Sequence, residues 1–357
     1  MNEQADESTR VLLSGNVAAA EGAMRAGCRF YAGYPITPQN EIIAHMADQL
    51  PLRGGAFVQA ESELAAINMV YGASAGGTRA MTSSSSPGVS LKQEGISYLA
   101  GSELPAVIVN VQRAGPGLGD VRPSQADYFQ ATRGGGHGDY RTIVLAPGSV
   151  QEMAELTHLA FELADKWRSP VLLLADGMVG QMMEPIRLDH LRESSPPPKP
   201  WALTGTAGRP RNLVRSLYLG PGELEGVNLR LQGRYEEIGR TEQRWEERGS
   251  EDGDIVLVAY GICARIVQEV VASPPAGLEG RLKLLRPITL WPFPSDRVAA
   301  LAGTAAGIAA VEMSAGQLVE DVRLAVEGRC PVHLFARMGG AIPKAGEIAD
   351  FVKSVFN

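Results

Sequence analysis

Residues 58–82 read VQAESELAAINMVYGASAGGTRAMT, and this stretch changes twice between two kinds of secondary structure. An apolar strand ends at Gln59, an Ala- and Gly-rich helix follows, and a second short strand closes the stretch. Ser62 is a suitable N-cap, which puts Glu63 in the first turn, where the helix dipole favours a carboxylate. By itself the pattern fits a capped packing helix with two solvated carboxylates, Glu61 and Glu63.

The same alternation of strand and helix continues on both sides. Strands are predicted at residues 30–34, 56–59, 79–82, 105–111, 142–145 and 171–175. Helices are predicted between them, one capped by Asn16 and one capped by Thr37 with Pro38 at its first position. This order predicts an α/β fold with a doubly wound parallel sheet, whose ligand site lies beyond the carboxyl ends of the strands. Gln59, Thr82 and Arg113 all fall at such ends.

Composition narrows the class of protein. A chain of 357 residues is long enough for two domains. The net charge of −7 argues against nucleic acid as a partner, and no apolar run approaches the roughly 18 residues that a membrane span needs. The three cysteines lie far apart without a Cys-x-x-Cys pattern, so this chain's thiols alone predict neither a zinc site nor an iron–sulfur cluster. An odd cysteine count without a secretory leader fits a reducing cytoplasm.

Changes in composition divide the chain into three parts. Residues 1–187 carry the alternating pattern. Residues 188–252 open with a proline-rich run and become dense in charge, which indicates a connecting arm that is partly irregular. Residues 253–357 return to alternation and predict a second, smaller α/β domain.

Several motifs together resemble one family. They are the run Tyr34-Pro-Ile-Thr-Pro38, the pair Glu63 and Arg113, and the glycine-rich segments at 115–119 and 134–140. With them, nearly the whole chain resembles the α subunit of the thiamine diphosphate-dependent 2-oxoacid:ferredoxin oxidoreductases, and its glycine-rich segments look most like the branched-chain type. The resemblance implies a pyrimidine-binding domain followed by a transketolase C-terminal-like domain. It also implies oxidative decarboxylation of a 2-oxoacid with coenzyme A to acyl-CoA, carbon dioxide and reduced ferredoxin.

The resemblance also implies roles for individual residues. Glu63 would bind a ring nitrogen of the cofactor's aminopyrimidine, and Tyr34, Pro35, Ile36 and Thr37 would line the same pocket. Arg113 and Thr37 would face the substrate's carboxylate and 2-oxo groups. Each role has an ordinary alternative: Glu61 could be the functional carboxylate, Arg113 a strand-end salt bridge, and Thr37 a helix cap only.

Other implied components lie outside this chain. No Gly-Asp-Gly…Asn-Asn signature for magnesium and diphosphate is present. The resemblance therefore assigns the diphosphate, Mg²⁺ and an iron–sulfur cluster to a β subunit, with γ and ferredoxin-like δ subunits, ferredoxin and coenzyme A as further partners.

The long glycine-rich segment of this chain is interpreted as a flexible lid, in which His137 is a weaker candidate for proton transfer.

The alternatives to a branched-chain enzyme differ in substrate or in class. Within the same family, 2-oxoglutarate and aryl 2-oxoacids are the competing substrates. A non-catalytic scaffold subunit and a stand-alone thiamine enzyme are the competing classes, and the missing diphosphate signature argues against the second of these.

Overall fold

The computed structural model describes residues 10–356, which form two compact units. The first unit contains the chain up to residue 110 together with residues 149–173 and 178–216. The second unit contains residues 111–148, 174–177 and the chain from residue 217 onward. No helix among the described residues is long and apolar enough to cross a membrane.

The first unit is built on a sheet whose strands follow the order β8-β5-β4-β2-β3. Their bounds are β2 Phe30–Gly33, β3 Ala56–Gln59, β4 Ala80–Ser84, β5 Ala106–Ala114 and β8 Pro170–Asp176, of which β5 and β8 continue into the second unit. Strand β2 pairs in parallel with β3 and β4, and β4 pairs in parallel with β5. The predicted parallel sheet is therefore confirmed. A separate antiparallel pair joins β1, Arg10–Ser14, to β9, Met183–Arg187.

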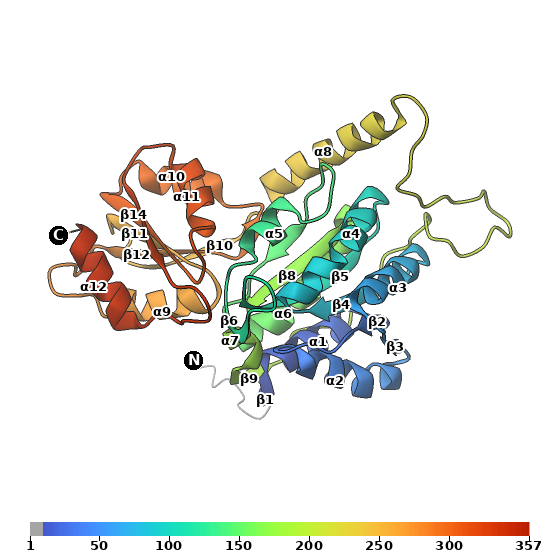
Figure 1. The fold of residues 1–357 in the computed structure, drawn as a ribbon, viewed down its shortest axis with the longest axis horizontal. Helices are drawn as coiled ribbons and strands as arrows, with labels where there is room; N and C mark the ends of the chain where they lie inside the picture. The colour runs from blue at the N-terminus through green and yellow to red at the C-terminus, as the bar shows by residue number, and fades with distance from the viewer. Residues whose placement is uncertain (1–9, 357) are drawn as a thin grey trace, which may run out of the picture. The chain divides into compact units, whose positions relative to one another are not determined.

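Helices connect these strands in the doubly wound manner (Figure 1). They are α1 Gly15–Arg25, α2 Asn40–Gln49, α3 Glu63–Ala75, α4 Ser86–Gly101, α6 Val150–Trp167 and the short α7 Gly177–Gln181, with a 3₁₀ turn at Pro51–Arg53. Helix α2 connects β2 to β3 at one edge of the sheet. Helix α3 then connects β3 to β4 on the other side of β2, and α4 connects β4 to β5. Right-handed crossovers put α2 on one face and α3 with α4 on the other. Helix α1 packs against α2 and α6.

The second unit has its own sheet, in the order β10-β12-β11-β14-β15. Its strands are β10 Trp245–Gly249, β11 Ile255–Val258, β12 Leu282–Pro287, β14 Gly307–Glu312 and β15 Val332–Ala336. All pairs are parallel except that of β10 with β12. The smaller strands are β6 Asp120–Pro123, which pairs with the end of β5, and β7 Ile143–Leu145, which pairs with β13 Thr289–Trp291.

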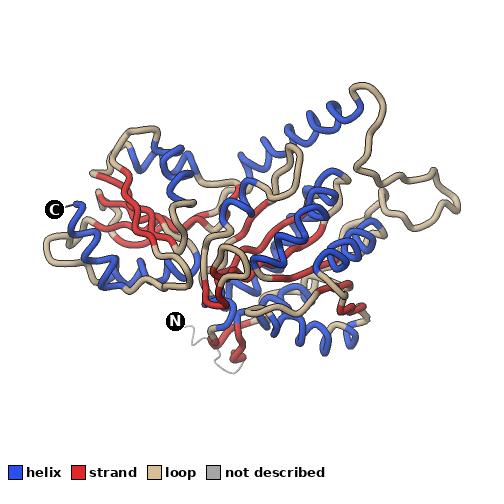
Figure 2. Tube along the Cα trace, viewed as in Figure 1, coloured by secondary structure: helices blue, strands red, loops and turns tan. Residues whose placement is uncertain are grey.

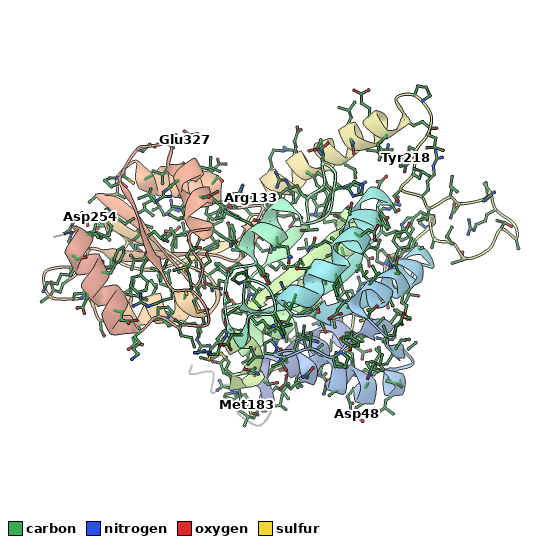
Figure 3. The ribbon with its side chains drawn as sticks, in the orientation of Figure 1. Asp48, Arg133, Met183, Tyr218, Asp254 and Glu327 are labelled. Atoms are coloured by element: carbon green, nitrogen blue, oxygen red, sulfur yellow. The ribbon has the colours of Figure 1, made fainter. Side chains whose placement is uncertain are left out.

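The helices of the second unit are α5 Tyr128–Arg133, α8 Glu223–Thr241, α9 Gly261–Ala272, α10 Ser295–Ala302, α11 Leu318–Val326 and α12 Ala345–Phe356. Arg133 of α5, labelled in Figure 3, forms an ion pair of 3.1 Å with Asp321 of α11. Gln125 donates its side-chain amide to Tyr260 O and accepts from Met313 N. These contacts hold residues 111–148 to the C-terminal sheet.

Several local predictions were wrong. Ser14, not Asn16, caps α1; Asn16 lies inside the helix and donates to Pro38 O at 2.8 Å and to Glu41 Oε2 at 2.7 Å. Thr37 does not cap α2, whose N-cap is Gln39. The glycine-rich segment contains β6 and α5.

The predicted arm, residues 188–252, is irregular up to α8 (Figure 2), and α8 itself is a regular helix inside it.

Two glycines on α3 and α4 differ sharply in their surroundings. A Cβ at Gly95 of α4 would come within 2.6 Å of two side-chain carbons of Ile67 on α3, whereas a Cβ at Gly72 would meet nothing within 4 Å. Gly95 therefore sets how closely the two helices pack. Gly72 only weakens its helix through its backbone freedom.

We expect Gly95→Ala to lower the free energy of unfolding by about 1–3 kcal/mol, because overpacking costs more than the gain in helix propensity. The matched variant Gly72→Ala should raise it by about 0.5–1 kcal/mol. Chemical denaturation of the purified protein measures both changes. A Gly95→Ala protein that is as stable as wild type, or more stable, would show that packing between α3 and α4 does not depend on Gly95.

Candidate functional site

The carboxyl ends of three parallel strands of the first unit meet at one edge of its sheet. Tyr34 directly follows β2, Glu63 begins α3 just after β3, and Ser85 precedes the start of α4 after β4. Strand order reverses at β2, because β3 lies on one side of it and β4 on the other. In open α/β sheets such a switch point is where ligands bind.

Glu63 is buried at this edge, with 6% of its surface exposed. Ser62 caps α3 as predicted, accepting from Ala65 N at 3.2 Å, and this fixes Glu63 at the first position of the helix. Among the described residues 10–356, none donates a hydrogen bond to the Glu63 carboxylate. Burying a carboxylate without a donor is costly, which makes Glu63 a candidate contact for a ligand. Glu61, by contrast, is exposed.

The start of α4 covers the Glu63 carboxylate. A Cβ at Gly88 would overlap both Glu63 Oε1 and Ser84 Oγ, so only glycine lets the helix approach this closely. The hydroxyls of Ser84 and Ser85 are buried and have no hydrogen-bond partner within the part of the chain that the structure describes. The edge therefore presents one carboxylate and two hydroxyls that no group of residues 10–356 satisfies.

Lys92 lies one turn further along α4 and is fully buried. Its ammonium donates to Thr82 Oγ1 at 3.0 Å and to the main-chain oxygen of Glu63 at 3.4 Å. Burial lowers the pKa of Lys92 from its ordinary 10.5 to about 8, against the raising effect of the Glu63 charge. A buried lysine beside a buried glutamate is thus part of the same cluster.

A second polar chain lies beneath the loop that follows β2. Tyr31 OH and Ser83 Oγ are 2.6 Å apart, and Ser83 Oγ donates to Gln39 Oε1 at 2.5 Å. Gln39 is fully buried, and its side-chain amide nitrogen has no partner among the residues that the structure describes. This chain supports the turn that carries residues 34–37.

The Tyr-Pro-Ile-Thr run lies at the mouth of this edge. Tyr34 and Pro35 are exposed, and Ile36 and Thr37 are half-buried. The Thr37 hydroxyl accepts from Asn40 Nδ2 at 3.5 Å, so it points along the start of α2 rather than capping it. Glu63 and the 34–37 segment therefore border one sheet edge.

Arg113 belongs to the second unit, near the end of β5. It is 7% exposed, and its Nη2 donates to Leu118 O at 3.0 Å across the turn between β5 and β6. His137 is exposed in the segment that follows α5.

Sequence reasoning missed Lys92, Gly88 and Gln39. The run of serines followed by Pro87 and Gly88 at the end of a strand was a usable signal, since four small polar residues at a strand end are costly to bury without a purpose. Lys92 gave no such signal, because lysines are rarely buried and its burial depends on how α4 packs.

The structure and the family models together define the class of protein to which this chain belongs. Residues 21–205 match the model "Pyruvate flavodoxin/ferredoxin oxidoreductase, thiamine diP-bdg", and residues 253–348 match "Pyruvate:ferredoxin oxidoreductase core domain II". The class is an oxidoreductase subunit that carries a thiamine diphosphate-binding domain.

Similar proteins agree with this class. The chain is 52% identical to ketoisovalerate oxidoreductase subunit VorB of Methanothermobacter marburgensis over 96% of its own length and 97% of that protein. The chain therefore belongs to the family of 2-oxoacid:ferredoxin oxidoreductases, which confirms the resemblance stated above.

Two solved structures agree with the fold. A 2-oxoglutarate:ferredoxin oxidoreductase from Magnetococcus marinus, with 2-oxoglutarate, coenzyme A and succinyl-CoA bound, matches with a TM-score of 0.84 and 28% identity, covering 98% of this chain. This chain spans only 66% of that one. A split-gene transketolase matches with a TM-score of 0.58 and 13% identity, which bears on the fold alone. The predicted fold class is confirmed.

The low pKa of Lys92 makes stability depend on pH. Between about pH 8 and 10.5 the unfolded chain keeps a proton that folded Lys92 has released, so the free energy of unfolding rises with pH in this window. In the protein without cofactor, we expect the free energy of unfolding to rise by an amount on the order of 3 kcal/mol across this window. We expect this rise to be absent in Lys92→Met.

Denaturation at several pH values across the window, compared as wild type minus variant, measures this contribution. Replacing the exposed Lys353 by Met is the control and should leave the pH profile unchanged. Parallel profiles for wild type and Lys92→Met would contradict a buried, titrating Lys92.

Proposed function

We propose that this chain is the α-type subunit of an enzyme that oxidatively decarboxylates a branched-chain 2-oxoacid to the acyl-CoA, with coenzyme A as acyl acceptor and ferredoxin as electron acceptor. The observation that carries the proposal is the buried Glu63 carboxylate, which has no donor among the described residues, at the switch point of a thiamine diphosphate-binding domain. The substrate class rests on the 52% identity to a ketoisovalerate oxidoreductase subunit.

The residues of the sheet edge fit the pyrimidine end of thiamine diphosphate. When bound, this cofactor supplies the carbon nucleophile and the electron sink for decarboxylation. Glu63 would hold a proton shared with a ring nitrogen of the aminopyrimidine, which requires a carboxyl group in a dry place. Gly88 leaves room beside that carboxyl, and residues 34–37, namely Tyr34, Pro35, Ile36 and Thr37, would border the ring.

Arg113 and Thr37 are proposed to bind the substrate. The planar guanidinium of Arg113 can hold a carboxylate in a two-pronged fork, and its hydrogen bond to Leu118 O orients it. The Thr37 hydroxyl is proposed to donate to the 2-oxo group or the carboxylate. His137 is exposed, which gives no support to a role in proton transfer.

The remaining components of the proposal come from partner subunits. A β subunit would hold the diphosphate, Mg²⁺ and an iron–sulfur cluster, with γ and ferredoxin-like δ subunits completing the complex. The similar protein is itself named as a subunit, which supports a multi-subunit assembly. The three cysteines are free in this chain, which suits a reducing compartment such as the cytoplasm.

The proposed domain organisation keeps a pyrimidine-binding domain over residues 1–187, an arm over 188–252 and a transketolase C-terminal-like domain over 253–357. The two family models, at residues 21–205 and 253–348, leave most of the proposed arm unmatched, which supports it as a separate element.

The competing candidates are tested on the purified complex. A higher kcat/KM for 2-oxoglutarate or an aryl 2-oxoacid than for 3-methyl-2-oxobutanoate would identify that competing 2-oxoacid as the substrate and reject the branched-chain assignment. A complex that shows no 2-oxoacid-dependent reduction of ferredoxin under any of these conditions would favour the non-catalytic scaffold.

Replacing Glu63 by Gln keeps the shape of the side chain but removes the shared proton. We expect Glu63→Gln in the assembled complex to lose about 100-fold or more in kcat. Glu61→Gln is the matched control and should stay near wild type, because Glu61 is exposed. Steady-state kinetics with a 2-oxoacid, coenzyme A and ferredoxin measure both. Equal losses in the two variants would mean that Glu63 is the wrong carboxylate.

Replacing Arg113 by Lys keeps the charge but removes the planar fork. Loss of the two-pronged contact should cost about 2–4 kcal/mol of transition-state binding, or roughly 30- to 1,000-fold in kcat/KM. Cofactor affinity should barely change, as measured by titration of the complex with thiamine diphosphate. An Arg113→Lys enzyme with wild-type kcat/KM for every 2-oxoacid tested would leave Arg113 a structural role at the end of β5.

A further inference from the structure

The side-chain amide of Asn16 is a buried polar group that the proposed chemistry does not use. Asn16 is the second residue of α1 and has no exposed surface. Its amide nitrogen donates to Pro38 O at 2.8 Å and to Glu41 Oε2 at 2.7 Å. An asparagine amide has two N–H donors, so both are used on one short segment of the chain. Asparagine is a poor helix former and is costly to bury, which favours a role for these two bonds over packing alone.

Both acceptors lie close to Thr37 in the sequence, where the chain passes from β2 into α2. Pro38 is the residue after Thr37, and Glu41 lies in the first turn of α2. Residues 34–39 form neither helix nor strand, so their position depends on turn contacts and on side chains from neighbouring elements. The Asn16 amide supplies such a contact at the Pro38 carbonyl, one residue from Thr37.

A second set of contacts holds the next residue of the same segment to the sheet. Gln39 Oε1 accepts from Ser83 Oγ of β4 at 2.5 Å, and that hydroxyl lies 2.6 Å from Tyr31 OH of β2. All three side chains are fully buried. Pro38 is therefore tied to α1 and Gln39 to the sheet. Thr37 comes directly before this pair, so its place depends on both contacts.

We propose that Asn16 is a positioning residue for Thr37, whose buried amide holds the Pro38 carbonyl and the first turn of α2 and thereby sets the place of the Thr37 hydroxyl. This inference rests on the proposed function, in which Thr37 binds the 2-oxoacid. Asn16 acts through the main chain of the segment and does not touch the substrate. Loss of its amide should leave the fold in place and let the segment that carries Thr37 move.

The first test is hydrogen–deuterium exchange of main-chain amides in the assembled complex without substrate, measured on the peptide that covers residues 34–41. Asn16→Ala removes both bonds, so this peptide should exchange about fivefold faster. Ser74→Ala is the matched control, because Ser74 is also fully buried and its hydroxyl also donates to a proline carbonyl, that of Pro105, at 2.6 Å. The control should leave the exchange of residues 34–41 unchanged. Equal exchange of this peptide in Asn16→Ala and in wild type would overturn the proposal.

The second test is steady-state kinetics of the same complexes with 3-methyl-2-oxobutanoate. A displaced Thr37 hydroxyl loses its contact with the substrate, so Asn16→Ala should lower kcat/KM for the 2-oxoacid about tenfold. The KM for coenzyme A should stay near wild type, because Thr37 is not proposed to contact it. Ser74→Ala should leave both values unchanged. An equal loss of kcat/KM in Asn16→Ala and Ser74→Ala would show a general effect of lost stability and reject the positioning role.

Thr37→Val and the double variant separate this inference from the proposed function. Thr37→Val should lower kcat/KM on its own, and adding Asn16→Ala should then change little further, because the hydroxyl through which Asn16 acts is gone. If Thr37→Val leaves kcat/KM unchanged, the proposed function of Thr37 fails. If Thr37→Val lowers kcat/KM but Asn16→Ala acts equally with and without the hydroxyl, the positioning role fails and Asn16 acts by packing.

Glu41→Ala provides a second route should Asn16→Ala not assemble. Glu41 is exposed, so its replacement leaves the core intact. The variant removes one of the two acceptors of the Asn16 amide, so kcat/KM for the 2-oxoacid should fall by less than in Asn16→Ala, about threefold. The loss should again be absent when Thr37 is replaced by Val. An assembled Glu41→Ala complex with wild-type kcat/KM would overturn the proposal.

Discussion

The desolvated carboxylate of Glu63 is the constraint on which the site depends. It lies at the first position of α3, beneath the start of α4, and no described residue donates to it. Neighbouring features accommodate this costly arrangement: Ser62 fixes the start of the helix, Gly88 has no Cβ that would displace the carboxylate, and Lys92 donates to the main-chain oxygen of Glu63. Under the proposed function, the cofactor supplies the hydrogen bond that this carboxylate lacks.

The topology of the sheet explains why this carboxylate lies at an edge that is open to a ligand. Strands β3 and β4 flank β2, so the crossovers through α2 and α3 run in opposite directions and leave the switch point uncovered. The turn after β2 and the starts of α3 and α4 all reach that point. Family membership then gives the chemistry, because the matching model describes thiamine diphosphate binding over the residues that build this edge.

The sequence was enough for the features that depend on neighbouring residues along the chain. Ser62 as a cap, Glu63 in the first turn and the exposed Glu61 all follow from short-range helix rules, and the structure confirms each of them. Thr37 failed as a cap because the turn after β2 extends to Gln39 before α2 begins. Lys92 and Gly88 could not be recognised, since their roles arise only when α4 packs on α3. The regular helix α8 was hidden by the charge density of the arm, because its apolar residues occupy a narrow stripe.

The central claim is that the Glu63 carboxylate receives its missing partner from the cofactor. A high-resolution structure of the assembled complex with thiamine diphosphate bound tests it directly. The account predicts a Glu63 carboxylate oxygen at hydrogen-bond distance, about 2.5–3.0 Å, from a ring nitrogen of the aminopyrimidine. An aminopyrimidine bound elsewhere, or a Glu63 carboxylate satisfied by a protein donor in that complex, would contradict it.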